Sequence, residues 1–267
     1  MLNLILVIIG TAIGILASMV GLGGGFLITP LLILIFKLQP KNAIAISLFA
    51  MSGTTISATI SYIRQKRVDF KLGLLYDLLD IPGIILGAYL TTILTSDVLK
   101  IICATFIIFV SLILMKKNKE ENIIKNPLQN KGWQRKIIDS TGKKFEYIVK
   151  NISFALISSF LGGLITGLVG LGGGITDVST MIFLGVPVHI AVATSEFAMA
   201  LTNSAGVIAH GFLRNILWEY AIPLALGTII GAQIGSLLAK KTKGKFLKRI
   251  IAFIAFIIGI RLIFSVP

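Results

Sequence analysis

Two carboxylates lie inside apolar stretches of this 267-residue chain. Asp177 falls in the apolar run 175–184, and Glu196 falls in the run 190–212. An ionisable side chain within a membrane-spanning segment is costly and is a functional hypothesis by default. Asp177 and Glu196 are therefore candidates for proton coupling. The alternatives are that either lies at an interface, or that Asp177 caps the start of a helix.

Hydroxyl and amide side chains follow on one apolar run in each half of the chain. Ser47 and Thr54 lie in the first half, and Thr194, Ser195 and Asn203 lie in the second. Such groups can hydrogen-bond the oxygens of an oxyanion without adding fixed charge. They are predicted to bind substrate. The alternative is that they form hydrogen bonds between helices.

Two glycine-rich stretches precede these groups. The five letters of Gly21-Leu22-Gly23-Gly24-Gly25 recur at 170–174, and each copy opens a short apolar run. A helix that begins after glycines presents unpaired N–H groups and a partial positive charge, which together suit an anion. The glycines predicted to line the site are Gly23, Gly24, Gly25, Gly172, Gly173 and Gly174. The alternative is close helix packing through small residues.

The glycine stretches belong to a longer internal repeat. Residues 43–51 and 191–199 are identical at six of nine positions, at an offset of 148. Gly87-Ala88 and Gly231-Ala232 extend the match further along each half. Two matches in the same order at nearly the same offset indicate an internal duplication.

The composition is that of an integral membrane protein. The chain is 55% hydrophobic and 13% charged, with a mean hydropathy of +0.95, whereas a soluble domain has roughly 25% charged residues. The apolar runs are continuous and do not alternate with polar residues, so they predict helices and exclude a barrel. The fold class is all-α, a polytopic membrane protein with glycine-broken helices.

Each repeat is predicted to hold about five helical elements. Repeat one covers 1–115, a polybasic linker covers 116–150, and repeat two covers 151–267. The expected elements are 2–20, 26–36, 43–63, 72–94 and 98–115 in repeat one, and 152–169, 175–184, 190–212, 218–238 and 250–266 in repeat two. The second half of the linker, 133–149, is expected to form a short interfacial helix.

The charge distribution bears on topology. Of the 25 Lys and Arg residues, 20 lie in 64–71, 116–150 and 240–249, the pattern of cytoplasmic loops under the positive-inside rule. If each glycine-linked pair is a re-entrant hairpin, the repeats are inverted and all three loops lie inside. If each pair is one broken span, the repeats are parallel and 240–249 lies outside. The basic loops favour inversion, and their expected partners are anionic lipid head groups, not nucleic acid.

Other ionisable residues have plainer interpretations. Asp77 and Asp80 lie near the predicted cytoplasmic end of a helix, and interfacial solvation is expected for both. His210 is expected to be satisfied at a helix end. The single Cys103 excludes a disulfide framework and is expected to be a packing residue. No metal-ligand spacing, cofactor motif or nucleophile–base pair is legible, so no metal, no cofactor and no enzymatic activity are expected.

The two Gly-Leu-Gly-Gly-Gly copies, the 26–30 continuation and the sequence at 191–195 resemble the sulfite exporter TauE/SafE family of membrane transporters. The resemblance covers both halves and implies a multi-pass carrier in the cell membrane for sulfite, sulfonates or related anions. The predicted function is a secondary transporter of a small anion, coupled to protons through Asp177 or Glu196. A passive anion channel and a non-transport scaffold are the alternatives.

Overall fold

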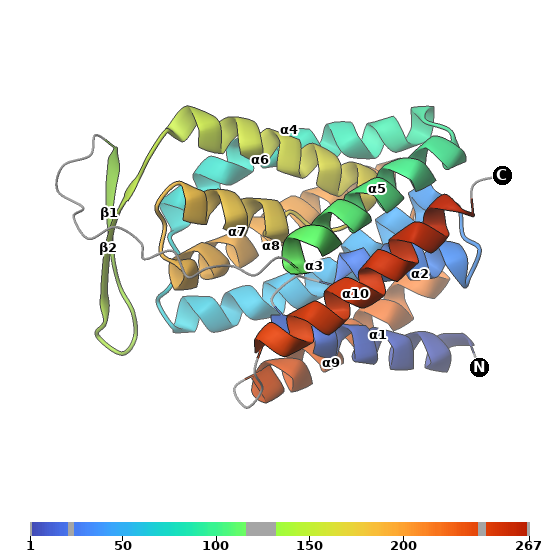
Figure 1. Ribbon diagram of the computed structural model, residues 1–267, viewed down its shortest axis with the longest axis horizontal. Helices are drawn as coiled ribbons and strands as arrows, with labels where there is room; N and C mark the ends of the chain where they lie inside the picture. Colours follow the sequence, from blue (N-terminus) through green and yellow to red (C-terminus); the bar gives the residue numbers. More distant parts are fainter. Residues whose placement is uncertain (1, 21–23, 116–131, 240–243, 266–267) are drawn as a thin grey trace.

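The computed structural model describes residues 2–20, 24–115, 132–239 and 244–265, which form ten helices and one two-stranded hairpin. The first five helices are α1 (Leu2–Val20), α2 (Gly25–Leu34), α3 (Pro40–Arg64), α4 (Phe70–Ile93) and α5 (Ser96–Met115). The last five are α6 (Ile152–Val169), α7 (Gly174–Phe183), α8 (Val188–Phe212), α9 (Trp218–Ala239) and α10 (Gly244–Ile263). The hairpin lies at one end of the helices, and both chain ends lie at the other (Figure 1).

The outer surface of the helices suits a lipid environment. Among the described residues, α3, α4 and α6 are each long and apolar enough to cross a membrane. Large apolar side chains are also exposed along the helix faces, including Leu78, Ile157 and Ile208. The predicted all-α membrane fold is confirmed at this level.

Helices α2 and α7 are short and begin inside the molecule. Each has ten residues, so each is about 15 Å long, and residues 170–174 before α7 are buried. The two helices end at opposite ends of the molecule. Leu184, just after α7, accepts a hydrogen bond from the backbone N–H of Lys150 beside the hairpin. The connection after α2 leads to Asn42, whose Nδ2 donates to the carbonyl of Asn215 at 2.7 Å, at the other end.

Helices α3 and α8 run antiparallel through the centre. Asn42 near the start of α3 contacts Asn215, which follows the end of α8. Thr59 near the end of α3 donates to the carbonyl of Glu196 near the start of α8, at 2.9 Å. The two helices therefore lie side by side in opposite directions.

Glycines bring two further helix pairs into backbone contact. A Cβ on Gly87 of α4 would collide with the Leu164 carbonyl of α6, and a Cβ on Gly231 of α9 would collide with the Thr11 carbonyl of α1. These residues sit where only glycine fits. The packing of α4 on α6 is thus repeated, on the other side of the molecule, by the packing of α9 on α1.

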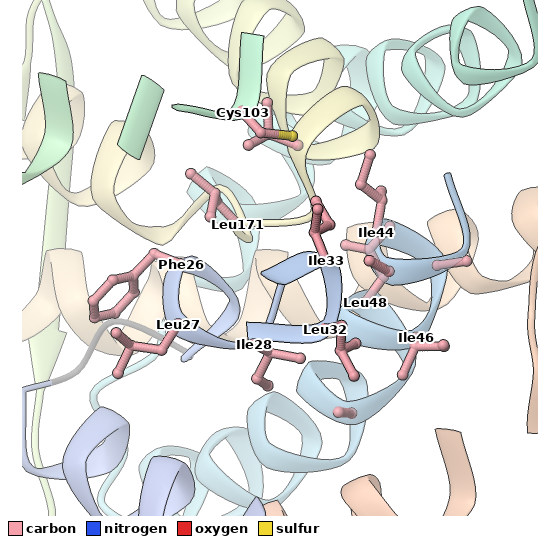
Figure 2. Close-up of a cluster of buried hydrophobic side chains, with 14 of the residues drawn as sticks. Phe26, Leu27, Ile28, Leu32, Ile33, Ile44, Ile46, Leu48, Cys103 and Leu171 are labelled. Carbon is pink, nitrogen blue, oxygen red and sulfur yellow. The ribbon is translucent and has the colours of Figure 1, made fainter. Parts of the chain in front are cut away.

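The apolar core surrounds α2 (Figure 2). Phe26, Ile28 and Leu32 are almost fully buried, and Leu48 of α3 and Cys103 of α5 belong to the same cluster. A ten-residue helix gains little stability from its own hydrogen bonds, so tertiary packing of this kind must hold it in place.

Residues 133–149 form a hairpin, and the predicted interfacial helix is wrong. Strand β1 (Trp133–Ile138) pairs antiparallel with β2 (Lys144–Val149). Side chains along β1 are alternately half-buried and exposed, and this two-residue period is that of a strand and not of a helix. Gly142 supplies a positive φ of 83° in the connecting turn. Side chains of β2 pack on α4, α7 and the start of α8.

Ion pairs attach the hairpin to the connection between α3 and α4. Asp69 accepts from Arg135 at 2.8 and 2.5 Å and from the Tyr147 hydroxyl at 2.6 Å. Burial alone would raise the pKa of the Asp69 carboxyl, but the hydrogen bonds from Arg135, Tyr147 and the Leu72 N–H hold it below its usual value. Asp69 also caps α4 through that same N–H at 3.2 Å. One buried carboxylate therefore joins hairpin and helix.

A second ion pair secures the turn of the hairpin. Arg67 lies 3.2 Å from the Asp139 carboxylate, and Ser140 donates its N–H to the Gln65 carbonyl. The Thr141 hydroxyl, the N–H groups of the turn and Arg67 together lower the pKa of Asp139 to about 2. Asp139 is therefore ionised at neutral pH and can hold the turn against Arg67.

Candidate functional site

The described end of the first glycine loop, Gly24-Gly25, meets the second glycine loop inside the molecule, although the two loops are 149 residues apart in sequence. A Cβ on Gly25 would collide with the Gly170 carbonyl, and it would lie 3.0 Å from the Leu171 Cα. The same Gly170 carbonyl accepts from Ser47 Oγ at 2.8 Å and from Thr29 Oγ1 at 3.3 Å. Contacts across the two halves thus fix the loops against each other.

The loops present two uncapped helix starts. Gly24, with a φ of 89°, precedes α2, and Gly173 precedes α7; neither start has a side-chain cap. Gly23 lies outside the described residues. Uncapped helix starts leave backbone N–H groups for another acceptor, and the helix dipole favours an anion there.

Met51 lies between the two loops, and Met199 lies beside the second. A Cβ on Gly25 or Gly172 would collide with Met51, and a Cβ on Gly174 would lie 2.7 Å from the Met199 Sδ. Met51 and Met199 stand at equivalent places in the two halves, 148 residues apart. Flexible thioether side chains fill irregular space and can change rotamer. The side chains of Met51 and Met199 therefore fill the space beside the glycines of the two helix starts.

The predicted hydroxyl residues differ in their partners. Thr54 Oγ1 donates to the Met51 carbonyl at 2.7 Å, and Thr194 Oγ1 accepts from the Asp69 N–H at 3.0 Å. Ser47 holds the Gly170 carbonyl, as described above. Ser195 Oγ is buried with no hydrogen-bond partner, and it lies 4.0 Å from the Cβ position of Gly174. Ser195 is thus the predicted hydroxyl that is free beside a helix start.

Asn203 is also buried without partners, but it lies elsewhere. Neither its amide nitrogen nor its amide oxygen has a hydrogen-bond partner. Eight residues of helix separate it from Ser195, which is about 12 Å along the axis of α8. One small anion cannot touch both side chains at once. The structure therefore does not bring the predicted substrate-binding residues into a single shell.

Asp177 belongs to a group of buried carboxylates on α4 and α7. It is 1% exposed, both carboxylate oxygens lack hydrogen-bond partners, and Asp80 and then Asp77 are the charges that act on it. Asp77 and Asp80 are 4% and 0% exposed, so their expected solvation at an interface is wrong. Helices α6, α7 and α8 cover this part of α4 and remove it from water.

Glu196 lies near α3 and not near the carboxylates around Asp177. It is 7% exposed, and its carboxylate acts on the Tyr62 phenol of α3. The two carboxylates predicted to couple protons, Asp177 and Glu196, therefore face different helices. His210 is buried, and its Nδ1 lies 3.0 Å from Asn215 Nδ2, so the amide donates to a neutral ring.

Sequence reasoning missed Asp77, Asp80 and Thr202 as a unit. The Thr202 hydroxyl lies 2.9 Å from Asp77 Oδ1 and 2.8 Å from Asp80 Oδ2. The available signal was the three-residue spacing of the two aspartates, which puts both on one helix face. Nothing local showed that α8 would cover that face. Within the part of the chain that the structure describes, no group of three His, Cys, Asp or Glu is placed to hold a metal ion.

Comparison with known proteins identifies relatives along the whole chain. The family described as Sulfite exporter TauE/SafE matches residues 6–262. The probable membrane transporter protein YunE of Bacillus subtilis is 34% identical, over 98% of this chain and 97% of its own. The probable membrane transporter protein YfcA of Escherichia coli K12 is 25% identical, over 91% of this chain and 83% of its own. No solved structure matches the chain.

Proposed function

Because the chain belongs to the sulfite exporter TauE/SafE family and is a multi-pass membrane transporter, we propose that it moves a small anion such as sulfite or a sulfonate. The transport is secondary, by alternating access, and is coupled to protons. The substrate binds where the two glycine loops meet.

The proposal includes two inverted repeats. Two structural facts support it. First, α3 and α8, which contain the matching sequences, run in opposite directions. Second, residues with a positive φ recur at equivalent positions 148 residues apart: Lys37 (53°) corresponds to Gly185 (101°), and Lys66 (55°) corresponds to Arg214 (55°). Inverted repeats with short interrupted helices are a recurrent transporter design, with the site at mid-depth where the repeats meet.

The observation that carries the proposed site is the buried, uncapped start of α7 beside Ser195, close to the start of α2 at Gly25. Helices α6, α7 and α8 contain no Lys or Arg, so the attraction for an anion comes from helix dipoles and N–H groups. Ser195 Oγ, free of partners, can donate to an anion oxygen beside Gly174. The same anion would be repelled by an ionised Asp177 three residues into α7, so anion binding favours a neutral Asp177.

The equivalent serines Ser195 and Ser47 provide a matched test. We expect Ser195→Ala to raise the KM for sulfite in proteoliposomes roughly tenfold, the value of one hydrogen bond to a charged group. Ser47→Ala removes a loop contact instead, so it lowers thermal stability and leaves the KM of the folded fraction near that of wild type. Equal KM values for wild type and Ser195→Ala would contradict the proposed site.

The form of the flux tests the function itself. A carrier saturates with substrate and responds to a pH gradient, whereas a channel conducts without saturation. Flux of sulfite and of a small sulfonate, each followed in proteoliposomes of purified protein and in protein-free liposomes, separates these cases. Flux equal to that of protein-free liposomes for both anions would reject the proposed substrate class.

A further inference from the structure

The contacts of Thr202 bear on where one proton lies. Its hydroxyl is within hydrogen-bond distance of two carboxyl oxygens, Asp77 Oδ1 at 2.9 Å and Asp80 Oδ2 at 2.8 Å. A hydroxyl has one hydrogen and can donate to only one of them. The other contact is a hydrogen bond only if that carboxyl group is protonated and donates to Thr202. Both contacts are full hydrogen bonds only with one of the two aspartates in its carboxylic acid form, so the geometry suits one bound proton.

Asp177 completes the group from α7. Adjacent glycines of α6 lie beside the carboxylates: the Cβ position of Gly162 is 3.4 Å from Asp177 Oδ1, and that of Gly163 is 2.6 Å from Asp80 Oδ1. A side chain at Gly163 would displace the Asp80 carboxylate. Asp77 Oδ2, Asp80 Oδ1 and both Asp177 oxygens have no hydrogen-bond partner. Four buried acceptor atoms without donors need an explanation, and protonation of the carboxyl groups supplies one.

The helices packed around this group offer it no positive charge, because α6, α7 and α8 contain no Lys or Arg and Lys71 at the start of α4 is exposed. On α4, Tyr76 lies nearby and its hydroxyl is 3.2 Å from Thr180 Oγ1 of α7. Helix α6 contributes the glycines and Ser159, whose hydroxyl donates to the Tyr76 carbonyl. Helix α8 contributes Thr202. Three buried carboxylates without a cationic partner cannot all be ionised, because an unpaired buried charge is very costly.

The other half of the molecule has no such group. With the offsets of the proposed repeats, Asp77, Asp80 and Asp177 correspond to Ala221, Leu224 and Ile28, all of them buried. Thr202 corresponds to Thr54, which bonds only within its own helix. The fold thus accommodates apolar residues at the matching places, so packing does not require the carboxylates.

We propose that Asp77 and Asp80, bridged by Thr202, form with the neighbouring Asp177 a proton-binding site that couples transport to the proton gradient. This assignment rests on the proposed function and adds residues to it. Bulk water delivers the proton to a carboxylate oxygen on one side of the membrane. The neutral Asp177 then tolerates the anion at the start of α7, and the proton returns to water when the anion leaves on the other side. Glu196, which faces α3, is not part of this site.

Infrared spectra of the purified full chain in lipid test proton binding without any substrate. We expect the C=O stretching band of a protonated carboxylic acid at neutral pH, and we expect it to weaken or shift in Asp77→Asn and Asp80→Asn. Asp97→Asn is the matched control, because Asp97 is 48% exposed and paired with Lys100, so the band stays unchanged. Absence of the band in wild type, or its persistence in both variants, would overturn the proton site.

Thr202 provides a second comparison that does not depend on removing a carboxylate. Thr202→Ser keeps the bridging hydroxyl, so the infrared band stays at its wild-type position. Thr202→Val keeps the shape and removes the hydroxyl, so the band shifts. The same shift in both variants would mean that packing, not the hydroxyl bridge, holds the carboxyl groups, and would overturn the bridging role.

Flux measurements test the coupling. In proteoliposomes, the ratio of anion flux with a pH gradient to exchange at equal pH exceeds one in wild type. In Asp177→Asn the ratio falls to about one while exchange persists, since an amide does not titrate in this range. Ratios at the wild-type value in Asp77→Asn, Asp80→Asn and Asp177→Asn would overturn the coupling, and so would flux that follows a sodium gradient at equal pH. Absence of exchange in wild type would reject the proposed function and not the proton site, which the infrared band tests alone.

Discussion

At the residue scale, single buried polar atoms decide which parts of the molecule are held and which remain available. Ser47 and Ser195 occupy equivalent positions in the two halves of the sequence. The Ser47 hydroxyl donates to a backbone carbonyl, whereas the Ser195 hydroxyl has no hydrogen-bond partner. Asp69 and Asp177 are both about 1% exposed, yet the first has an arginine and a tyrosine as partners and the second has only other carboxylates. The partners of Ser47 and Asp69 account for these two groups structurally, whereas Ser195 and Asp177 need another explanation.

The Asp69–Arg135 ion pair is testable through stability. We expect Arg135→Gln to lower the free energy of unfolding by about 2 kcal/mol, because it leaves a buried carboxylate without its charged donor. Cys103, buried and the single cysteine of the chain, reports unfolding through a thiol-reactive dye. Lys136→Gln is the control: its ion pair with Glu146 is more than half exposed and contributes little.

The same variant predicts a pH dependence. The pKa of Asp69 is below its usual value in the folded protein, so the ion pair stabilises fully above the ordinary aspartate range and is lost as pH falls through the lowered pKa. The difference in melting temperature between wild type and Arg135→Gln should therefore be largest at neutral pH and shrink below about pH 4. A difference that is constant with pH would show that charge is not its cause.

Residue types alone could predict part of this picture. A carboxylate at position 177 stood out because no other Asp, Glu, Lys or Arg lies between Lys150 and Glu196. The depth of Asp77 and Asp80 could not be predicted, because it depends on α6, α7 and α8 covering one face of α4. The roles of Thr194 and Ser195, neighbours in sequence, separate only once the Asp69 backbone is seen to approach the first of them.

At the scale of elements, glycines set the distance between helices. Gly87 and Gly231 allow α4 to contact α6 and α9 to contact α1 through backbone atoms. Such contacts are the main source of affinity between helices in lipid, where burial of apolar surface no longer drives association.

Substitution by alanine at these positions separates packing from helix propensity. We expect Gly87→Ala to lower the free energy of unfolding by roughly 1–3 kcal/mol, since the Cβ would force the helices apart. Gly211→Ala on α8 is the matched control, because the nearest atom to its Cβ position is 3.9 Å away. There the gain in helix propensity, about 1 kcal/mol, should stabilise the protein. Similar melting temperatures for the two variants would contradict the close packing.

The elements themselves were largely predictable. The positions of the long helices follow from apolar runs of membrane-spanning length, and the short α2 and α7 follow from runs too short to span. The hairpin was not predicted, because its alternation extends over six residues per strand and basic residues mask its apolar face. Its stability depends on packing against α4, α7 and α8, which no local pattern shows.

At the scale of the whole molecule, the equivalent elements lie at opposite ends. Lys66 follows α3 beside the hairpin, where Ser140 donates its N–H to the Gln65 carbonyl. Arg214 follows α8 and precedes Asn215, which contacts Asn42 near the opposite end of α3. The inverted arrangement favoured by the basic loops stays a prediction, as do the repeat boundaries and the cytoplasmic place of the linker. The opposite directions of α3 and α8 support it.

These two positions provide the topology test. Both side chains are exposed and share a φ of 55°, so each tolerates cysteine equally well. With inverted repeats, a membrane-impermeant thiol reagent added to intact cells labels Arg214→Cys and not Lys66→Cys, and permeabilised cells label both. Wild type, with only the buried Cys103, gives the background. Equal labelling of the two variants, whether both label in intact cells or both label only after permeabilisation, would favour parallel repeats.

The hairpin also connects the buried carboxylates of α4 to a surface that a protein binder can reach. Asp69 is at once the cap of α4 and the acceptor for the hairpin, so a binder that clamps β1 and β2 also holds the helix that carries Asp77 and Asp80. An antibody fragment raised against the folded hairpin would then recognise one conformation of the transporter better than the other. By reciprocity, the factor by which the fragment changes the affinity for the transported anion equals the factor by which the anion changes the affinity for the fragment. A binder of these two six-residue strands could thus modulate the buried site without entering it.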